Sequence, residues 1–319
     1  MNSPQFSAVG IDVGGTKIAA GCVTFPEATT RFRRVIPSNP QRGGLAVLEN
    51  VVRLAEELMA EAQAAGTKVD GIGLGLCELV SPAGRILSAN SVRWLNLPVR
   101  ERLSALAPFT LEADVRAAAL AEARFGAGHG LRLFLYLTVG TGISSCLVID
   151  GQPFVGTRGA TGTMASTPLT AVCEHCGHVN QQTLEQIAAG PGLVTRLNRQ
   201  RTMKVQTGQE VLAAAVAGDA EAFAVVRTAG EALGSSVGLL INVLDPEALI
   251  VGGGLGLSEG PYWESLCAAT RHHIWSEVHR DLPILRAATG SDAGLIGAAA
   301  AAWNTFTFPA PKQPQQPQQ

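Results

Sequence analysis

The sequence predicts an α/β protein in two lobes, and a repeated pattern carries that prediction. Two glycine turns, at residues 12–17 and 137–142, each lie between apolar runs typical of β-strands. They are 126 positions apart (140 minus 14), so a strand–turn–strand unit occurs twice. With 319 residues, of which 46% are hydrophobic, the chain is long enough for two domains that each bury a core.

Apolar periodicity predicts the remaining elements in chain order. The expected strands are residues 8–13, 18–25, 69–76, 110–112, 133–139, 143–149 and 248–251. The expected helices are 48–62, 115–125, 219–244 and 291–303, the last rich in small residues that would pack closely on their neighbours. The expected domains are 1–118 joined by the helix 291–305, then 119–290, with residues 309–319 as a disordered Pro/Gln-rich tail.

Charge and composition narrow the function. The formal net charge is −2 and no sustained Lys/Arg run occurs, unlike the pattern of a nucleic-acid-binding protein. No basic stretch followed by an apolar one opens the chain, and no segment is apolar over the roughly 20 residues that a membrane span needs. The six cysteines are scattered, and four lie in apolar contexts typical of reduced thiols. We therefore expect a cytoplasmic protein with neither nucleic-acid nor membrane partners.

The two glycine turns have the composition of phosphate-binding loops. Glycine has no Cβ, so the backbone at Gly14, Gly15, Gly140 and Gly142 can approach a phosphate and direct N–H groups at it. Two such turns suggest a polyphosphate held between two lobes. The alternative is that each turn merely joins two strands.

Asp12 ends a buried apolar strand, where its charge must be offset. A hydrated Mg²⁺ beside phosphates would do so, and Thr16 and Lys17 add a hydroxyl group and a cation. Two other glycine clusters do not fit the dinucleotide fingerprint, because Leu76 and Leu257 occupy the third glycine position. The sequence therefore favours phosphate chemistry over hydride transfer.

Together these motifs resemble the ROK family of bacterial sugar kinases and repressors, within the actin/hexokinase-like ATPase superfamily. The resemblance spans nearly the whole chain and implies a two-lobed actin/hexokinase-like (ribonuclease H-like) fold with a central cleft, ATP and Mg²⁺ as cofactors, and a homodimer. Residues 12–17 match the family's first phosphate motif, 140–142 its second, and 245–254 its adenosine motif. The implied cofactor-binding residues are Asp12, Gly14, Gly15, Thr16, Lys17, Gly140, Thr141, Gly142, Gly252, Gly253 and Gly254.

The segment 111–122 is similar to the one that carries the family's catalytic aspartate, which falls on Asp114. Phosphoryl transfer to an alcohol needs a group that accepts the hydroxyl proton, and a carboxylate can fill that role. The alternative is that Asp114 only caps the helix that follows, and both roles can coexist. The N-terminus of that helix would keep the carboxylate ionised.

The sugar side departs from the family pattern. Ala113 stands where the family has an asparagine, and Cys77-Glu78 replaces a Pro-Gly pair. Thr163 and Ser166 replace a sugar-binding glutamate and a histidine that serves both sugar and zinc. The resemblance implies that the substrate-binding residues are Asn90, Asp114, Thr163, Ser166 and Glu185.

Loss of hydrogen-bonding partners weakens discrimination for particular hydroxyls, at roughly 1–3 kcal/mol for each bond. Either the pocket is rebuilt for another polyol, such as an amino sugar, deoxysugar or cyclitol, or turnover is lost and a nucleotide-binding shell remains. Because Asp114 and the phosphate motifs are present, we expect ATP-dependent phosphorylation of a hydroxyl on a hexose-like sugar, amino sugar or cyclitol. The alternative is a catalytically inactive nucleotide- or sugar-binding regulator. Polyphosphate stays open as a phosphoryl donor.

The loop 173–178 stands in place of the family's zinc loop but lacks its three-cysteine pattern. Cys173, His175, Cys176 and His178 have the chemistry of zinc ligands, although so short a span does not readily surround a metal. The alternative is a polar surface loop with two reduced thiols. The family's repressors carry a DNA-binding segment before the core, whereas the first expected strand here starts at Ala8.

Overall fold

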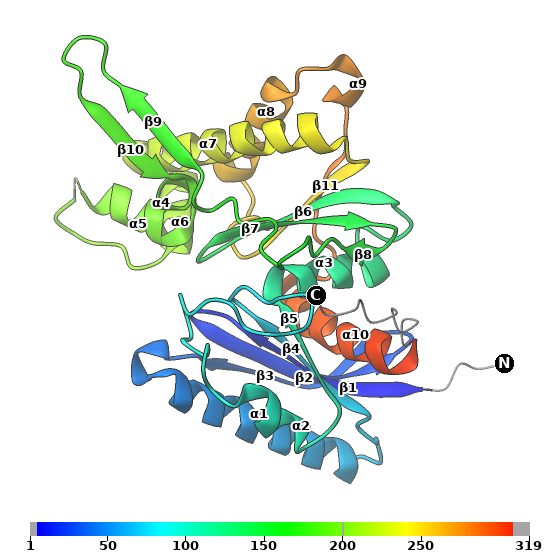
Figure 1. Ribbon diagram of the computed structural model, residues 1–319. Coiled ribbons are helices and arrows are strands. Elements are labelled where there is room, and N and C mark those ends of the chain that lie inside the picture. The colour runs from blue at the N-terminus through cyan, green and yellow to red at the C-terminus, as the bar shows by residue number, and fades with distance from the viewer. Residues whose placement is uncertain (1–4, 200, 309–319) are drawn as a thin grey trace, which may run out of the picture. The chain divides into compact units, whose positions relative to one another are not determined.

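The computed structural model describes residues 5–199 and 201–308. The chain divides into two compact units: Met1–Ala118 with Gly294–Gln319, called here the first unit, and Ala119–Ala293, the second unit. Figure 1 shows the path of the chain through both. The tail expected over residues 309–319 lies outside the described residues.

The first unit is built on a mixed five-stranded sheet in the order β3-β2-β1-β4-β5. Its strands are β1 (Phe6–Val13), β2 (Lys17–Phe25), β3 (Thr29–Pro37), β4 (Gly71–Leu76) and β5 (Phe109–Ala113). Strand β1 pairs antiparallel with β2 and parallel with β4. Its helices are α1 (Gly44–Ala64), α2 (Val99–Ser104), the start of α3 (Asp114–Phe125) and nearly all of α10 (Ala293–Thr307), with a 3-10 turn at Pro40–Arg42.

Helix α10 packs directly on the backbone of β1 and β4. A Cβ added to Gly10 would overlap the Leu295 carbonyl oxygen, and one added to Gly73 would overlap that of Ala298. The close packing predicted for this small-residue helix is therefore confirmed. Because side chains alternate along a strand, Val9 points to the opposite face, where it joins the apolar core formed with α1.

The second unit repeats the plan with a mixed sheet in the order β12-β11-β6-β7-β8. Its sheet strands are β6 (Leu133–Val139), β7 (Ile143–Ile149), β8 (Gln152–Pro153), β11 (Ala248–Gly252) and β12 (Ile284–Arg286). Strand β6 pairs antiparallel with β7 and parallel with β11, as β1 does with β2 and β4. The duplication expected from the two glycine turns is thus present in the topology.

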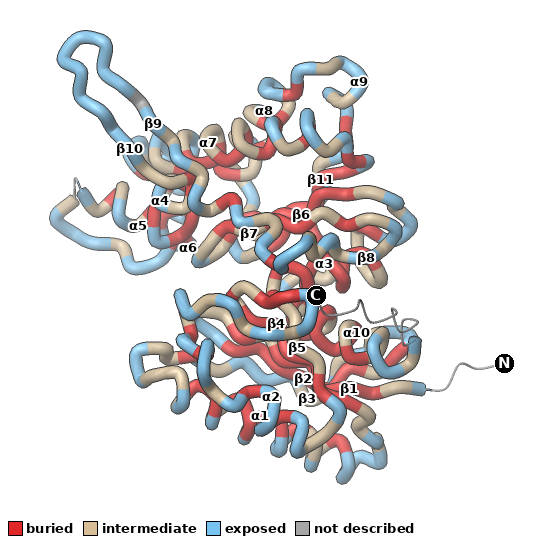
Figure 2. Tube along the Cα trace, viewed as in Figure 1, coloured by how far each residue is buried: buried red, intermediate tan, exposed pale blue. Residues whose placement is uncertain are grey.

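The rest of α3, six further helices and a separate hairpin complete the described part of the second unit. The helices are α4 (Leu184–Ala188), α5 (Gly190–Asn198), α6 (Gly208–Val216), α7 (Ala220–Leu244), α8 (Pro261–His273) and α9 (Glu277–Arg280), with a 3-10 turn at Gly290–Asp292. The hairpin pairs β9 (Pro168–Val172) with β10 (Val179–Thr183). Figure 2 shows its outer end as exposed chain. Every strand and helix predicted from the sequence is found, with ends shifted by a few residues.

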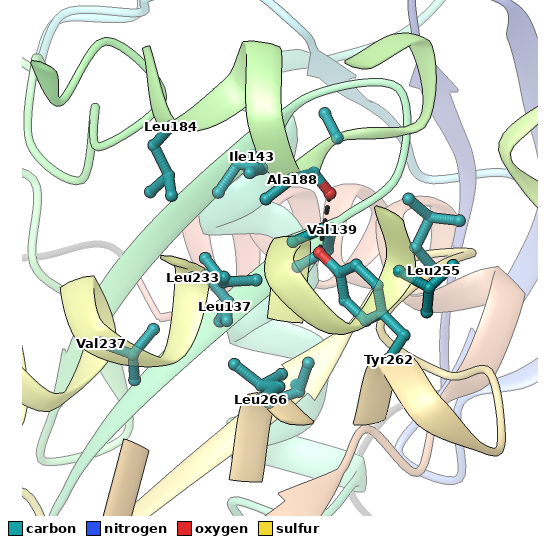
Figure 3. Close-up of a cluster of buried hydrophobic side chains, with 14 of the residues drawn as sticks. Leu137, Val139, Ile143, Leu184, Ala188, Leu233, Val237, Leu255, Tyr262 and Leu266 are labelled. Carbon is teal, nitrogen blue, oxygen red and sulfur yellow. Dashed lines mark hydrogen bonds between the residues drawn. The ribbon is translucent and has the colours of Figure 1, made fainter. Parts of the chain in front are cut away.

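Helix α7 contributes several side chains to the hydrophobic core of the second unit. Its 25 residues are long and apolar enough to cross a membrane by length and composition, so the expectation that no segment meets that test is wrong. In the structure Leu233 and Val237 lie in the hydrophobic core with Leu266 of α8 (Figure 3). Gly234 lets the two helices approach, because a Cβ there would lie 2.6 Å from the Leu266 carbonyl oxygen.

Candidate active site

The first glycine turn joins β1 to β2. The amide of Gly14 donates to the carbonyl oxygen of Lys17 (3.0 Å), which closes the turn, and Thr16 and Lys17 are exposed. A Cβ added to Gly15 would meet only Ser91, at 3.9 Å. The turn therefore offers an open, backbone-lined surface of the kind that receives a phosphate.

Asp12 precedes this turn at the end of β1. Its carboxylate lies against Gly294, near the start of α10, where a Cβ would overlap it. Burial raises the pKa of Asp12 to about 6, and the charge of Lys17 offsets part of that rise. A desolvated carboxyl group beside an open glycine turn suits a cation with phosphate ligands.

Asp114 is the first residue of α3, directly after β5. Its Oδ1 accepts a hydrogen bond from the Val115 amide at 2.6 Å. Burial, followed by the charge of Asp12, raises the pKa of Asp114 to about 7. The Val115 hydrogen bond at the helix N-terminus and the charge of Arg116 lower this pKa, but they offset only part of the two raising effects.

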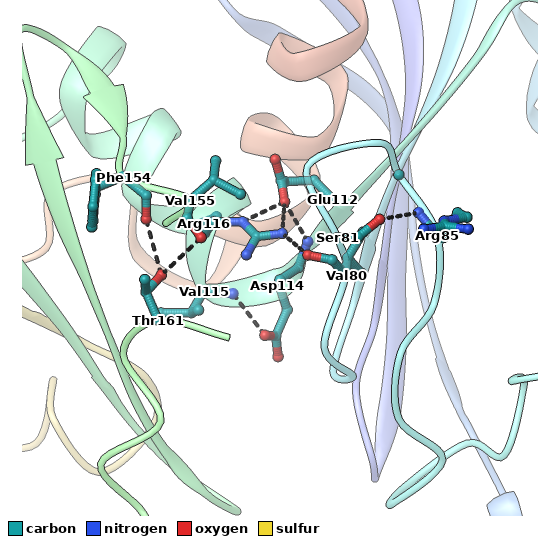
Figure 4. A network of polar contacts seen from close by, with 12 residues as sticks. Val80, Ser81, Arg85, Glu112, Asp114, Val115, Arg116, Phe154, Val155 and Thr161 are labelled. Carbon is teal, nitrogen blue, oxygen red and sulfur yellow. Dashed lines mark hydrogen bonds and ion pairs between the residues drawn. The ribbon is translucent and has the colours of Figure 1, made fainter. Parts of the chain in front are cut away.

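An ion pair fixes the β5–α3 junction that carries Asp114. Arg116 is buried and lies 2.5 Å from Glu112, and its Nη2 also donates to the Val80 carbonyl oxygen at 2.7 Å (Figure 4). Glu112 in turn accepts from the Ala113 amide at 2.8 Å. These bonds leave the backbone at Asp114 little freedom to shift.

The loop after β4 brings two further residues to the same place. The thiol of Cys77 and the hydroxyl of Ser91 lie close to each other. Burial, and then the charge of Asp114, raises the pKa of Cys77. Sequence reasoning selected Asn90 from this loop, and that side chain is exposed. Cys77 and Ser91 were not selected as site residues, because their approach to Asp114 depends on how the loop folds back.

The second glycine turn joins β6 to β7. The amide of Gly140 donates to the Gly142 carbonyl oxygen at 2.9 Å, and Thr141 is exposed. Oε2 of Glu185 accepts from the Ile143 amide at 3.0 Å, and a Cβ on Gly142 would lie 2.8 Å from the same oxygen. Glu185, selected for the sugar, is therefore in contact with the second glycine turn.

The Gly252–Gly254 segment lies beside this second turn. At Gly253, where φ is +81°, a Cβ would overlap the backbone of Val139, so only glycine lets the two segments meet. A Cβ on Gly140 would lie 3.8 Å from the Gly254 amide nitrogen. Nε2 of Gln209, at the start of α6, would be 3.2 Å from a Cβ on Gly254. The structure thus places the second glycine turn beside the expected adenosine motif and brings Gln209, which has no sequence signal, next to Gly254.

The remaining predicted sugar residues also belong to the second unit. Thr163 and Ser166 are both exposed, and the Glu185 amide donates to the Ala165 carbonyl oxygen between them at 3.0 Å. This bond places the segment carrying Thr163 and Ser166 next to Glu185. Asn90 and Asp114 belong to the first unit.

The expected zinc ligands occupy the exposed tip of the β9–β10 hairpin. Cys173 donates through its amide to the His178 carbonyl oxygen at 2.8 Å, and backbone hydrogen bonds from Cys176 and His175 to its sulfur lower the pKa of Cys173. Among residues 5–199 and 201–308, no three His, Cys, Asp or Glu side chains converge to hold a metal ion. The donor set therefore does not fit the zinc site that the sequence allowed.

Comparison with known proteins finds relatives that match nearly the whole chain. The chain is 28% identical to a glucokinase from Halalkalibacterium halodurans over 311 residues, covering 91% of this chain and 92% of that one. It is 28% identical to an N-acetylmannosamine kinase from Citrobacter koseri, covering 92% and 97%. A ROK family glucokinase from Streptomyces griseus, solved in complex with glucose and AMPPNP, aligns with a TM-score of 0.79 and 26% identity over 93% of this chain and 99% of that one.

The fold and these similarities define an ATP-dependent carbohydrate kinase with an actin/hexokinase-like fold. The ROK family model matches residues 8–304, and the chain belongs to the ROK family.

Proposed function

We propose that this protein transfers the γ-phosphoryl group of ATP to a hydroxyl of a hexose-like sugar, amino sugar or cyclitol, with Asp114 as the general base. The observation that carries the proposal is the position of Asp114, a carboxyl group with a pKa of about 7 at a rigid strand–helix junction beside Asp12. A base with a pKa near the working pH combines a useful ionised fraction with good proton affinity. The similarity to a glucokinase and to an N-acetylmannosamine kinase supports the substrate class.

In this mechanism the acceptor oxygen forms a bond to the γ-phosphorus while the bond from that phosphorus to the β-γ bridging oxygen breaks. The hydroxyl proton passes to Asp114, and ADP leaves. Asp12 fits as a carboxylate that helps hold Mg²⁺ through its water shell, and the ion would supply positive charge at the phosphates when bound. Backbone amides near Gly14, Gly15, Gly140 and Gly142 would stabilise the charge that develops on the phosphoryl oxygens.

The remaining roles belong to the same proposal. Thr16, Lys17 and Thr141 complete the phosphate-binding turns, and Gly252–Gly254 receives the adenosine, with inorganic polyphosphate as the alternative donor. The acceptor-binding side chains are Asn90, Thr163, Ser166 and Glu185, in addition to Asp114. We further propose that the protein is a cytoplasmic homodimer with no nucleic-acid or membrane partner, whose domains are 1–118 joined by the helix 291–305, and 119–290. Light scattering and cell fractionation would check the homodimer and its location.

The test is ATP-dependent phosphorylation read by mass spectrometry across hexoses, hexosamines, deoxysugars and cyclitols. The wild type is compared with Asp114→Asn and with Asp281→Asn, which removes an exposed carboxylate of the second unit. We expect a product with the wild type and Asp281→Asn, and none with Asp114→Asn, while the dissociation constant for ATP changes less than twofold. Parallel reactions with polyphosphate identify the donor.

The alternative is a nucleotide- or sugar-binding regulator without turnover. It is favoured by the replaced sugar contacts at Ala113, Thr163 and Ser166. ATP binding by the wild type without transfer to any acceptor would support it and reject the kinase proposal.

A further inference from the structure

Glu78 is a buried carboxylate that the proposed chemistry does not use. It follows β4 directly after Cys77, and only 5% of its surface is exposed. Burying a carboxylate is unfavourable unless hydrogen-bond donors satisfy it. A glutamate is therefore tolerated at this position only if neighbouring groups donate hydrogen bonds to its carboxylate.

Four donors from one short loop surround the carboxylate. Oε2 accepts from the Ser88 hydroxyl at 2.5 Å and from the Asn90 amide at 2.9 Å. Oε1 accepts from the amides of Ser91 at 2.5 Å and Val92 at 3.0 Å. These hydrogen bonds hold the pKa of Glu78 below its usual value despite burial. With both oxygens occupied twice, Glu78 is not available to accept a proton from a substrate.

The same loop is anchored at its far end by the core. Val92 and Trp94 are fully buried, and Trp94 Nε1 donates to the Gly44 carbonyl oxygen at 2.9 Å. Ser91 lies between the Glu78 anchor and this apolar anchor. The backbone at Ser91 is therefore held on both sides.

This loop conformation places Ser91 near Asp114 and the first glycine turn. The Ser91 hydroxyl lies close to the Cys77 thiol, and that thiol lies close enough to Asp114 for the aspartate's charge to act on it. Ser91 is also the residue that a Cβ on Gly15 of the first glycine turn would meet. A hydroxyl group is thus placed where an acceptor bound at Asp114 could hydrogen-bond to it.

We propose that Glu78 is a positioning residue, which holds the Ser88–Val92 loop so that the Ser91 hydroxyl contacts the acceptor sugar. The inference rests on the proposed kinase function and adds a specificity-determining contact to it. Ser91 acts on the substrate directly, whereas Glu78 acts through the loop.

The test compares Glu78→Gln, which keeps the size but turns an amide NH₂ toward the loop's donors, with Ser91→Ala and the double variant. Glu56→Gln, an exposed glutamate of α1, is the control. We expect Glu78→Gln and Ser91→Ala each to raise KM for the acceptor at least fivefold, with kcat changed less and the dissociation constant for ATP within twofold. The double variant should be little worse than either single one, because both act through the same contact.

A second measurement follows the loop itself by hydrogen–deuterium exchange and mass spectrometry on a peptide that contains residues 88–92. We expect at least tenfold faster exchange of these amides in Glu78→Gln, unchanged exchange in Ser91→Ala, and unchanged exchange in α1. If Glu78→Gln does not fold, Glu78→Asp, whose shorter side chain cannot reach all four donors, replaces it in both measurements. An unchanged acceptor KM in both single variants, or unchanged loop exchange in the Glu78 variant, would overturn the inference.

Failure of the kinase proposal has a different signature. In that case the wild type phosphorylates no acceptor. The positioning role of Glu78 is then tested by hydrogen–deuterium exchange of the loop and by sugar binding measured calorimetrically. Faster loop exchange with weaker sugar binding in Glu78→Gln would keep the positioning role, and no change in either would remove it.

Discussion

Asp12 and Asp114 lie against the same glycine. A Cβ added to Gly75 of β4 would lie 3.8 Å from Oδ1 of Asp12 and 3.6 Å from Cα of Asp114. Parallel pairing of β1, β4 and β5 brings the ends of these strands together, which is why two residues 102 positions apart (114 minus 12) share one site. The charge of Asp12 then contributes to the raised pKa of Asp114.

The first prediction concerns the pH dependence of catalysis. Because Asp114 must be ionised to accept a proton and its pKa is about 7, kcat/KM for the acceptor should fall about tenfold per pH unit below about pH 7 and level off above it. Steady-state rates at saturating ATP between pH 5 and 9 would check this, with nucleotide affinity measured at each pH as the control. A kcat/KM that stays constant between pH 9 and pH 5 would contradict the assignment.

The second prediction concerns stability. Between pH 3.8 and about 7 the folded state binds the Asp114 proton more tightly than the unfolded chain, so this residue's contribution to the free energy of unfolding falls as pH rises through that window. Asp114→Asn removes the cost of ionising this buried carboxyl group. The free energy of unfolding of the variant, relative to that of the wild type, should therefore increase by on the order of 2 kcal/mol from pH 5 to pH 8. Urea unfolding at both pH values measures this change, and the exposed-site control Asp281→Asn should show no change in stability relative to the wild type between the two pH values. Equal differences at both pH values would argue against a raised pKa.

The third prediction concerns the packing of α10 on the first sheet. Gly73→Ala places a Cβ on the Ala298 carbonyl, a backbone atom that cannot rotate away, and should destabilise the protein by about 3 kcal/mol or more. Gly21→Ala would meet the Thr30 methyl group at 3.0 Å, so its cost should be clearly smaller. Thermal unfolding of the two variants tests the comparison. Equal losses would mean that the helix can shift.

The fourth prediction concerns the cysteines. Cys173 and Cys176 are exposed and the pKa of Cys173 is lowered, whereas burial raises the pKa of Cys22, Cys77 and Cys267. Iodoacetamide at pH 7.5 should therefore alkylate the hairpin pair first, at least tenfold faster than the others, because the thiolate is the reactive form. Peptide mass spectrometry gives the rates, with Cys173→Ser as the control. Slow labelling that a zinc chelator accelerates would instead show a metal bound by the hairpin.

Much of the fold was predictable because its signals are local. Apolar runs on either side of Gly14 and Gly140 identified the paired strands, and helical periodicity identified α1, α3 and α7. The β9–β10 hairpin was missed because β10 is polar and exposed, which leaves no alternating pattern to detect. The zinc ligands were overestimated because proximity in sequence does not make four side chains converge on one point.

The sequence by itself determined that the chain contains two copies of a strand–turn–strand unit, and it identified Asp12, because a glycine turn and an acidic residue at the end of an apolar strand are patterns of neighbouring residues. Asp114 was identified by the resemblance of residues 111–122 to the family's catalytic segment. Tertiary structure alone decided the environment of those residues. The pKa of Asp114 depends on burial and on Asp12, and the position of Ser91 depends on Glu78. These effects come from groups that approach through strand pairing and loop folding, and Coulomb energy and desolvation depend on distance in space rather than along the chain.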